Sequence, residues 1–220
     1  MTATLRALAV LMAAACAAPT ADALSKNEEK ALFAGTLLGV GLGTRALILR
    51  DLNPEAAPLD RRMFIAVHEG MRSPLLSGVV SVVNELGDGR VLLIGSLAAA
   101  EWGTPKGRRA GRFVFASVAA GSLASETLKR IIGRPRPLNP EDRRSMPSGH
   151  TTNAFAAAAG LSHEYPRWAP LFYGLAAGVG FSRIYLGRHY PSDTLGGALL
   201  GMSSARVVLR RDSAVLAFSF

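Results

Sequence analysis

The short stretch from Pro147 to His150 places a histidine directly before an alanine-rich apolar run. Ser148 stands where a helix N-cap is expected, and Gly149 lets the backbone approach another group closely. The free N–H groups and the positive dipole end of a helix start bind anions. His150 in this first turn can donate a proton to a group held there. A capping turn with a half-buried histidine accounts for the same residues.

A basic segment upstream begins at Lys129 and carries Arg136, followed by a proline, seven residues later. We expect a helix to run to about Ile132 and to end at Gly133 and the prolines beyond it. A guanidinium matches two phosphate oxygens, and an ammonium adds a point charge. Taken alone, the same cations also suit a solvated basic loop or a helix C-terminus.

A third segment downstream holds Arg183 at the end of an apolar run, then His189 and Asp193 four residues apart. Pro191 lies where the first turn of a helix tolerates proline. At this spacing the carboxylate can reach one imidazole nitrogen, fix the tautomer and support the charge of an attacking histidine. A local ion pair at a helix start is the alternative. Together, however, the three segments favour phosphoryl transfer through a phosphohistidine.

The three segments resemble the three-part signature of the type 2 phosphatidic acid phosphatase superfamily, which includes bacterial non-specific acid phosphatases and vanadium haloperoxidases. The matching residues are Lys129 to Pro137, Pro147 to His150, and Ser182 to Asp193. All three parts agree in order and in internal spacing. The rest of the chain agrees with this family only in its helical character.

The resemblance implies a role for each residue of the signature. His189 would attack phosphorus, Asp193 would orient it, and His150 would protonate the leaving oxygen and later activate water. The residues implied to bind the phosphoryl oxygens are Lys129, Arg136, Ser148, Gly149 and Arg183. Arg134 and Arg188 lie outside the signature and are expected to add supporting charge only. The resemblance implies neither a metal site nor a cofactor, because fixed cations stabilise the phosphoryl charge.

The elements that must position these residues are expected to be helices. Alanine and leucine dominate the apolar runs, and no alternation with a period of two persists. We therefore predict an all-α fold, a single bundle of about six to eight helices. The runs are Ala31 to Gly43, Val91 to Trp102, Phe113 to Ser125, Asn153 to Leu161, Ala169 to Phe181 and Thr194 to Met202. Polar joints at residues 51–62, 87–90, 103–109, 133–144 and 163–167 separate them.

The first 23 residues have the pattern of a secretory signal peptide, with Arg6 before an apolar core from Ala7 to Ala18 and a small-residue site at residues 21–23. Cys16, the single cysteine, lies inside this segment. We expect residues 24–220 to form the phosphatase domain. A retained N-terminal anchor is the alternative. The expected location is the periplasm or the outer face of the inner membrane, and an integral membrane protein with short spans remains open.

The net charge of +9 and the pI near 10.6 favour anionic partners. No nucleic-acid-binding motif is present, so we expect a phosphorylated substrate and a possible membrane surface instead. The sequence thus predicts a metal-independent phosphatase acting on monoesters or pyrophosphates, preferably of lipids. A periplasmic acid phosphatase for small esters is the alternative, followed by a vanadium haloperoxidase and a non-catalytic binding protein. The oligomeric state is not predicted.

Overall fold

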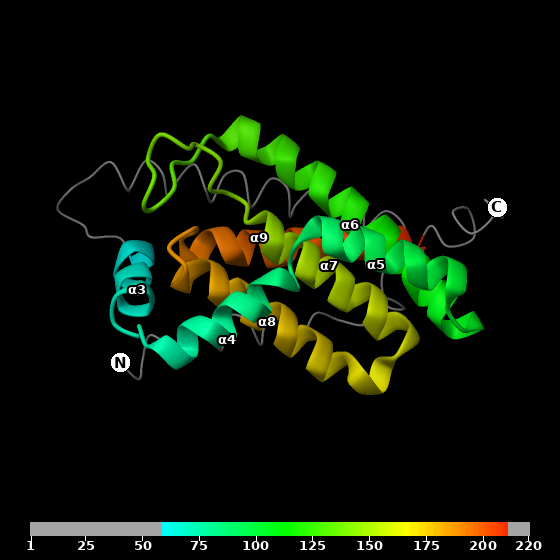
Figure 1. Ribbon diagram of the computed structural model, residues 1–220. Helices are drawn as coiled ribbons and strands as arrows, with labels where there is room; N and C mark the ends of the chain where they lie inside the picture. The colour runs from blue at the N-terminus through cyan, green and yellow to red at the C-terminus, as the bar shows by residue number, and fades with distance from the viewer. Residues whose placement is uncertain (1–58, 211–220) are drawn as a thin grey trace.

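The computed structural model describes residues 59–210, in which every regular element is helical (Figure 1). Within this range the predicted all-α class is confirmed, with no strand and with seven α-helices. They are α3 (Leu59–His68), α4 (Pro74–Glu85), α5 (Gly89–Trp102), α6 (Pro105–Ile132), α7 (Gly149–Glu164), α8 (Ala169–Tyr185) and α9 (Pro191–Arg210), with a short 3-10 turn, η2 (Pro166–Trp168), before α8.

Capping residues fix where several helices begin. The hydroxyl of Thr104 accepts a hydrogen bond from Gly107 N at 3.1 Å, and Pro105 follows as the first residue of α6. Proline suits this position because the first helical N–H has no partner within the helix. Asp88 caps α5 in the same way. The joint predicted for residues 103–109 is therefore too long, because α6 begins at Pro105, the third residue of that stretch.

Helices α3 and α4 were not predicted, and the start of α3 falls within the polar joint predicted for residues 51–62. Helix α3 is amphipathic. The charged residues on its exposed face interrupt the apolar ones in the sequence, so no continuous apolar run marks the helix. Phe64 and Val67 of α3 pack with Val80 of α4 against Ile184 and Tyr185 at the end of α8. Through this cluster, α3 packs against the end of the bundle at which α9 begins.

The central helix is α7, which packs against α6, α8 and α9 (Figure 1). Alanines dominate its buried contacts, around the larger side chains Phe155 and Val179. Gly201 of α9 lies so close to α7 that a Cβ there would clash with Thr152 O and Ala156 N. This close packing brings the start of α7 beside the start of α9. The α6–α7 and α8–α9 connections lie at the same end of the bundle (Figure 1).

Some sequence predictions fall outside the described residues. These are the signal peptide at residues 1–23, Cys16 within it, and the apolar run from Ala31 to Gly43.

Between residues 59 and 210, no helix has both the length and the apolar character needed to cross a membrane.

The close approach of α9 to α7 yields a test of the packing. Gly201→Ala is expected to lower the free energy of unfolding by about 2 kcal/mol, because its Cβ overlaps backbone that cannot move independently. Gly78→Ala in α4 is the matched control, since a Cβ there meets nothing within 4 Å. The control should raise the free energy of unfolding by about 0.5 kcal/mol. Thermal unfolding followed by circular dichroism measures both, and equal stabilisation would contradict this packing.

Candidate active site

The last turns of α6 supply the first predicted phosphate ligand, Lys129. Its Nζ lies against the backbone of Gly149, where an added Cβ would be only 3.1 Å away. Glycine at this point of α7 therefore leaves room for the ammonium group. Lys129 Nζ donates to Glu126 Oε1 at 2.6 Å, and Glu126 also pairs with Arg144. Although burial alone would raise the pKa of Glu126, these two cations lower it, so the carboxylate is charged.

The connection between α6 and α7 brings Arg136 to the third segment. As predicted, α6 ends at Ile132, and Gly133 caps it with a left-handed φ of 61°. Arg136 Nη1 then donates to the carbonyl of Arg188 at 3.3 Å. Arg136 Nε lies 2.7 Å from Asp142 Oδ2, a close ionic contact without the alignment of a hydrogen bond.

Ser148 occupies the N-cap position of α7, as predicted, but its side chain does not cap the helix. The hydroxyl of Ser148 accepts a hydrogen bond from Thr151 Oγ1 at 3.0 Å instead. The N–H groups in the first turn of α7 therefore receive no side-chain partner from Ser148. Ser148 N donates to the carbonyl of Asp193 at 3.0 Å, which ties the start of α7 to the first turn of α9.

His189 lies buried in the connection between α8 and α9, and α9 begins two residues later at Pro191. Its Nδ1 is 3.7 Å from Asp193 Oδ2, which is longer than a hydrogen bond. Such contacts are often long in ligand-free sites and tighten when substrate binds. The Asp193 oxygens accept hydrogen bonds from Arg134 Nη1 at 2.7 Å, Ser145 Oγ at 2.6 Å and Tyr190 N at 2.8 Å.

The electrostatic surroundings of His150 include groups from both other segments. The pKa of His150 is lowered to about 4, first by burial and then by the charge of Arg183. His189 and Lys129 lower it further, and Asp88 partly opposes them. Charge effects on a pKa weaken with distance, so Lys129, Arg183 and His189 lie close enough to His150 to influence its imidazole. His150 is therefore neutral at pH 7 when no anion is bound.

The pKa of His189 is also lowered, mainly by burial. The charges of Arg183 and Arg136 add to this effect, while Asp193 opposes it. His189 is therefore neutral at pH 7, which leaves a lone pair for nucleophilic attack. Burial, Arg136 and Arg188 lower the pKa of Arg183 to about 10, so this guanidinium keeps its charge at pH 7.

Four buried polar atoms at the site have no hydrogen-bond partner among residues 59–210: Ser125 Oγ, Arg136 Nε, Arg183 Nε and His189 Nδ1. An unpaired buried polar group costs about 1–3 kcal/mol, so binding of an anion that pairs with the serine hydroxyl or with either guanidinium Nε is favoured. Ser125 was not predicted, although it lies one helical turn before Lys129. Asn84 of α4 was also missed, and its Oδ1 accepts a hydrogen bond from Arg183 Nη1 at 2.6 Å.

Asp60 was not predicted to belong to the site, and Arg134 lies in a different environment from the one expected. Arg134, expected to add supporting charge only, is almost completely buried and bridges Asp193 and Asp60. No spacing in the sequence points to Asp60, because it comes from α3, far from the signature. Within residues 59–210 there is no group of three or more histidine, cysteine, aspartate or glutamate side chains placed to hold a metal ion.

Comparison with known proteins agrees with this arrangement. The sequence profile of the PAP2 superfamily matches residues 110–215, which include all three segments. The chain belongs to the PAP2 superfamily. The resemblance found in the sequence is thereby confirmed.

This PAP2 chain is 33% identical over 105 residues to the lipid A 1-phosphatase of Rhizobium etli, an alignment that covers 41% of the chain and 45% of that protein. It is also 33% identical over 108 residues to the decaprenylphosphoryl-5-phosphoribose phosphatase of Mycolicibacterium smegmatis, covering 46% of the chain and 59% of the relative. The chain thus spans less than two thirds of the length of both relatives.

Two solved structures have a similar fold. The crystal structure of Aquifex aeolicus LpxE has a TM-score of 0.61 and 28% identity, and covers 71% of this chain and 98% of its own. The transmembrane PAP2-type phosphatidylglycerolphosphate phosphatase of Bacillus subtilis has a TM-score of 0.62 and 25% identity, and covers 84% of this chain and 100% of its own.

The pKa of His150 offers a test of the site's geometry. Arg183→Gln removes the positive charge that contributes most to the lowering, so the pKa of His150 should rise from about 4 toward its ordinary value of 6.5. An NMR titration of the imidazole resonances measures it. Arg167→Gln removes an equal charge from η2 and should leave the pKa unchanged. Equal responses in the two variants would contradict the placement of Arg183 beside His150.

Proposed function

We propose that this PAP2 protein is a phosphatase that hydrolyses lipid phosphate monoesters or pyrophosphates through a phosphohistidine on His189. The observation that carries the proposal is a buried, neutral His189 beside Asp193 and among the cations Arg183 and Arg136. A neutral imidazole can attack phosphorus, and fixed cations stabilise the charge that accumulates on the phosphoryl oxygens in the transition state.

In the first step, His189 forms a bond to phosphorus while the bond from phosphorus to the leaving oxygen breaks. Nδ1 of His189 faces Asp193, so Nε2 is the attacking nitrogen. The Asp193 carboxylate supports the positive charge that the imidazole gains. The groups proposed to bind the non-bridging oxygens are Lys129, Arg136, Arg183, the Ser148 hydroxyl and the Gly149 N–H.

His150 carries the proton in both steps. The pKa of His150 in the free site is low because the imidazole is buried and lies near Arg183. A bound phosphate places negative charge beside the imidazole and therefore raises this pKa. Protonated His150 then gives its proton to the leaving oxygen. In the second step it takes a proton from the water that attacks phosphorus. The bond from nitrogen to phosphorus breaks, and neutral His189 and inorganic phosphate result.

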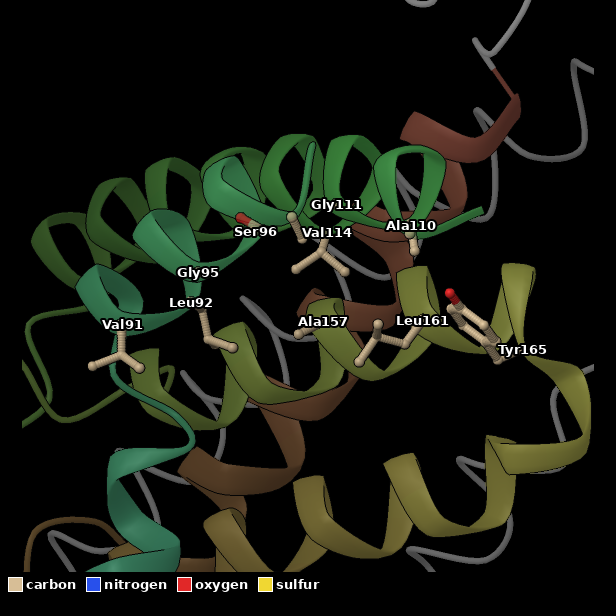
Figure 2. Close-up of a pocket in the computed structure, with 12 residues that line it drawn as sticks. Val91, Leu92, Gly95, Ser96, Ala110, Gly111, Val114, Ala157, Leu161 and Tyr165 are labelled. Carbon is tan, nitrogen blue, oxygen red and sulfur yellow. The ribbon is translucent and has the colours of Figure 1, made fainter. Parts of the chain in front are cut away.

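An apolar groove supports a lipid as the leaving group. The groove has a volume of about 320 Å³ and lies between α5, α6 and α7, with Leu92, Ala157 and Leu161 among its lining residues (Figure 2). A second, smaller apolar hollow shares these three residues and extends the lining to Ala154. His150 lies one turn before Ala154 on the same face of α7. We therefore place the lipid chain of the substrate in this groove, leading away from His150.

Exposed apolar side chains support association with a membrane. Leu75 of α4 is 82% exposed and Ile94 of α5 is 70% exposed, and Trp102 at the end of α5 is exposed as well. Apolar surface of this kind marks interaction sites, and tryptophan is enriched at membrane–water interfaces. The Bacillus subtilis neighbour is a transmembrane protein. We propose that the first 23 residues direct export and that the protein lies at the outer face of the inner membrane.

The proposed reaction is tested by phosphate release from the full chain in EDTA, with phosphatidate, a prenyl pyrophosphate and a small aryl phosphate as substrates. Activity should persist, because fixed cations serve where other phosphatases use metal ions. His189→Ala should lower kcat at least about a thousandfold. His163→Ala is the matched control, since this exposed histidine packs on Phe113 and should keep normal activity. Comparable activity in the two variants would refute the phosphohistidine.

The groove is tested by a side chain that fills it. A Cβ at Gly95 meets nothing within 4 Å, and Gly95 lines the groove, so Gly95→Leu fits without disturbing the backbone. It should lower kcat/KM for a long-chain lipid phosphate about tenfold, the loss of about two buried methylene groups. Hydrolysis of the aryl phosphate should not change. Gly78→Leu on α4 is the control, and a parallel loss for both substrates would argue against a lipid-binding groove.

A further inference from the structure

A buried chain of charges runs from α3 to the carboxylate beside His189. Arg134 is 2% exposed, and its Nη2 donates to Asp60 Oδ2 at 2.6 Å while its Nη1 donates to Asp193 Oδ1 at 2.7 Å. Asp60 is 7% exposed, and Asp193 is fully buried. The guanidinium also lies over the ring of Tyr190, 4.3 Å from its centroid. Three charged groups are thus packed in contact, away from water.

Asp60 also binds the first turn of α9. Its Oδ1 accepts a hydrogen bond from Ser192 N at 2.9 Å, and its Oδ2 accepts one from Ser192 Oγ at 2.6 Å. The first N–H groups of a helix have no partner within the helix, so Asp60 acts as a cap supplied by another element. Asp60 therefore holds the first turn of α9, which carries Asp193, in two ways: directly by its hydrogen bonds to Ser192, and indirectly through Arg134.

The order of the charges matters for His189. Asp193 supports a positive imidazole, but Arg134 in direct contact would by itself cancel the negative charge of Asp193. Asp60 on the far side of Arg134 offsets that guanidinium, so the three groups together retain one net negative charge. Buried ion pairs add little net stability, and apolar residues of similar volume often replace them without loss. A role in stability alone therefore does not explain why Asp60 and Arg134 are charged.

We propose that Asp60 and Arg134 are positioning residues for the nucleophile. Arg134 orients the Asp193 carboxylate. Asp60 offsets the positive charge of Arg134, so that the negative charge of Asp193 can stabilise a positively charged His189. The inference rests on the proposed phosphohistidine reaction. Neither residue touches the phosphate in this scheme. Their loss should therefore lower kcat and leave KM nearly unchanged.

The test is a double-mutant cycle in the full chain with the aryl phosphate as substrate. Asp60→Asn leaves the three positions with no net charge, and Arg134→Gln leaves them with two negative charges. Each single variant should lower kcat about 10- to 100-fold, as for other partners that orient a functional histidine, with KM changed less than about twofold. The double variant restores one net negative charge, so its kcat should exceed that of Asp60→Asn.

Folding controls keep the result interpretable. Asp60→Glu keeps the charge, so its kcat should stay within about threefold of the unmodified protein even if Asp60→Asn unfolds. Arg109→Gln breaks the ion pair between Arg109 and Glu164 on α6 and α7 and should leave kcat unchanged. Thermal unfolding of every variant separates a loss of fold from a loss of rate.

The outcomes separate this inference from the proposed function. A double variant no faster than Asp60→Asn, or single variants with normal kcat, would overturn the inference while His189→Ala remained inactive. Full activity of His189→Ala would overturn the phosphohistidine reaction itself.

Discussion

The hydrogen bonds of Asp193 are the interactions on which the site depends, because they join the first turn of α9 to the α6–α7 connection and to the start of α7. One oxygen accepts from Arg134, the other accepts from Ser145 and from Tyr190 N, and the backbone carbonyl accepts from Ser148 N. Burial alone would raise the pKa of Asp193, yet its neighbours lower it. Arg134 and Ser145 from the α6–α7 connection thus reach the buried carboxylate in the first turn of α9, and together with His189 they keep it charged.

In the proposed reaction, the cations of the site must be kept together before phosphate binds, although they repel one another. Local carboxylates reduce this repulsion: Glu126 pairs with Lys129, and Asp142 contacts Arg136. Both carboxylates are partly exposed, so each pair contributes little free energy. Little stabilisation is therefore lost when a phosphate takes the place of these carboxylates beside the cations. The phosphate also gains contact with Arg183, whose Nε has no hydrogen-bond partner in the described residues.

The sequence predicted the helical class and placed the signature residues correctly at helix ends. Lys129, Ser148 and Asp193 depend on local rules of capping, proline position and helical spacing, which act over a few residues. Asp60 and the burial of Arg134 could not be predicted, because they depend on how α3 docks against α8 and α9. The joint predicted for residues 103–109 was too long because Thr104 and Pro105 begin a helix here, whereas the same residue types also occur where helices end.

The position of His150 links the reaction to the choice of substrate. An acid that protonates the leaving oxygen must lie on the side from which the leaving group departs. On α7 that side continues from His150 through Ala154 and Ala157 to Leu161, which line the apolar groove. The direction of a lipid chain therefore follows from the position of the acid. The same holds for a lipid pyrophosphate, whose leaving phosphate carries the chain. In the proposed reaction, one face of α7 thus connects proton transfer with recognition of an apolar leaving group.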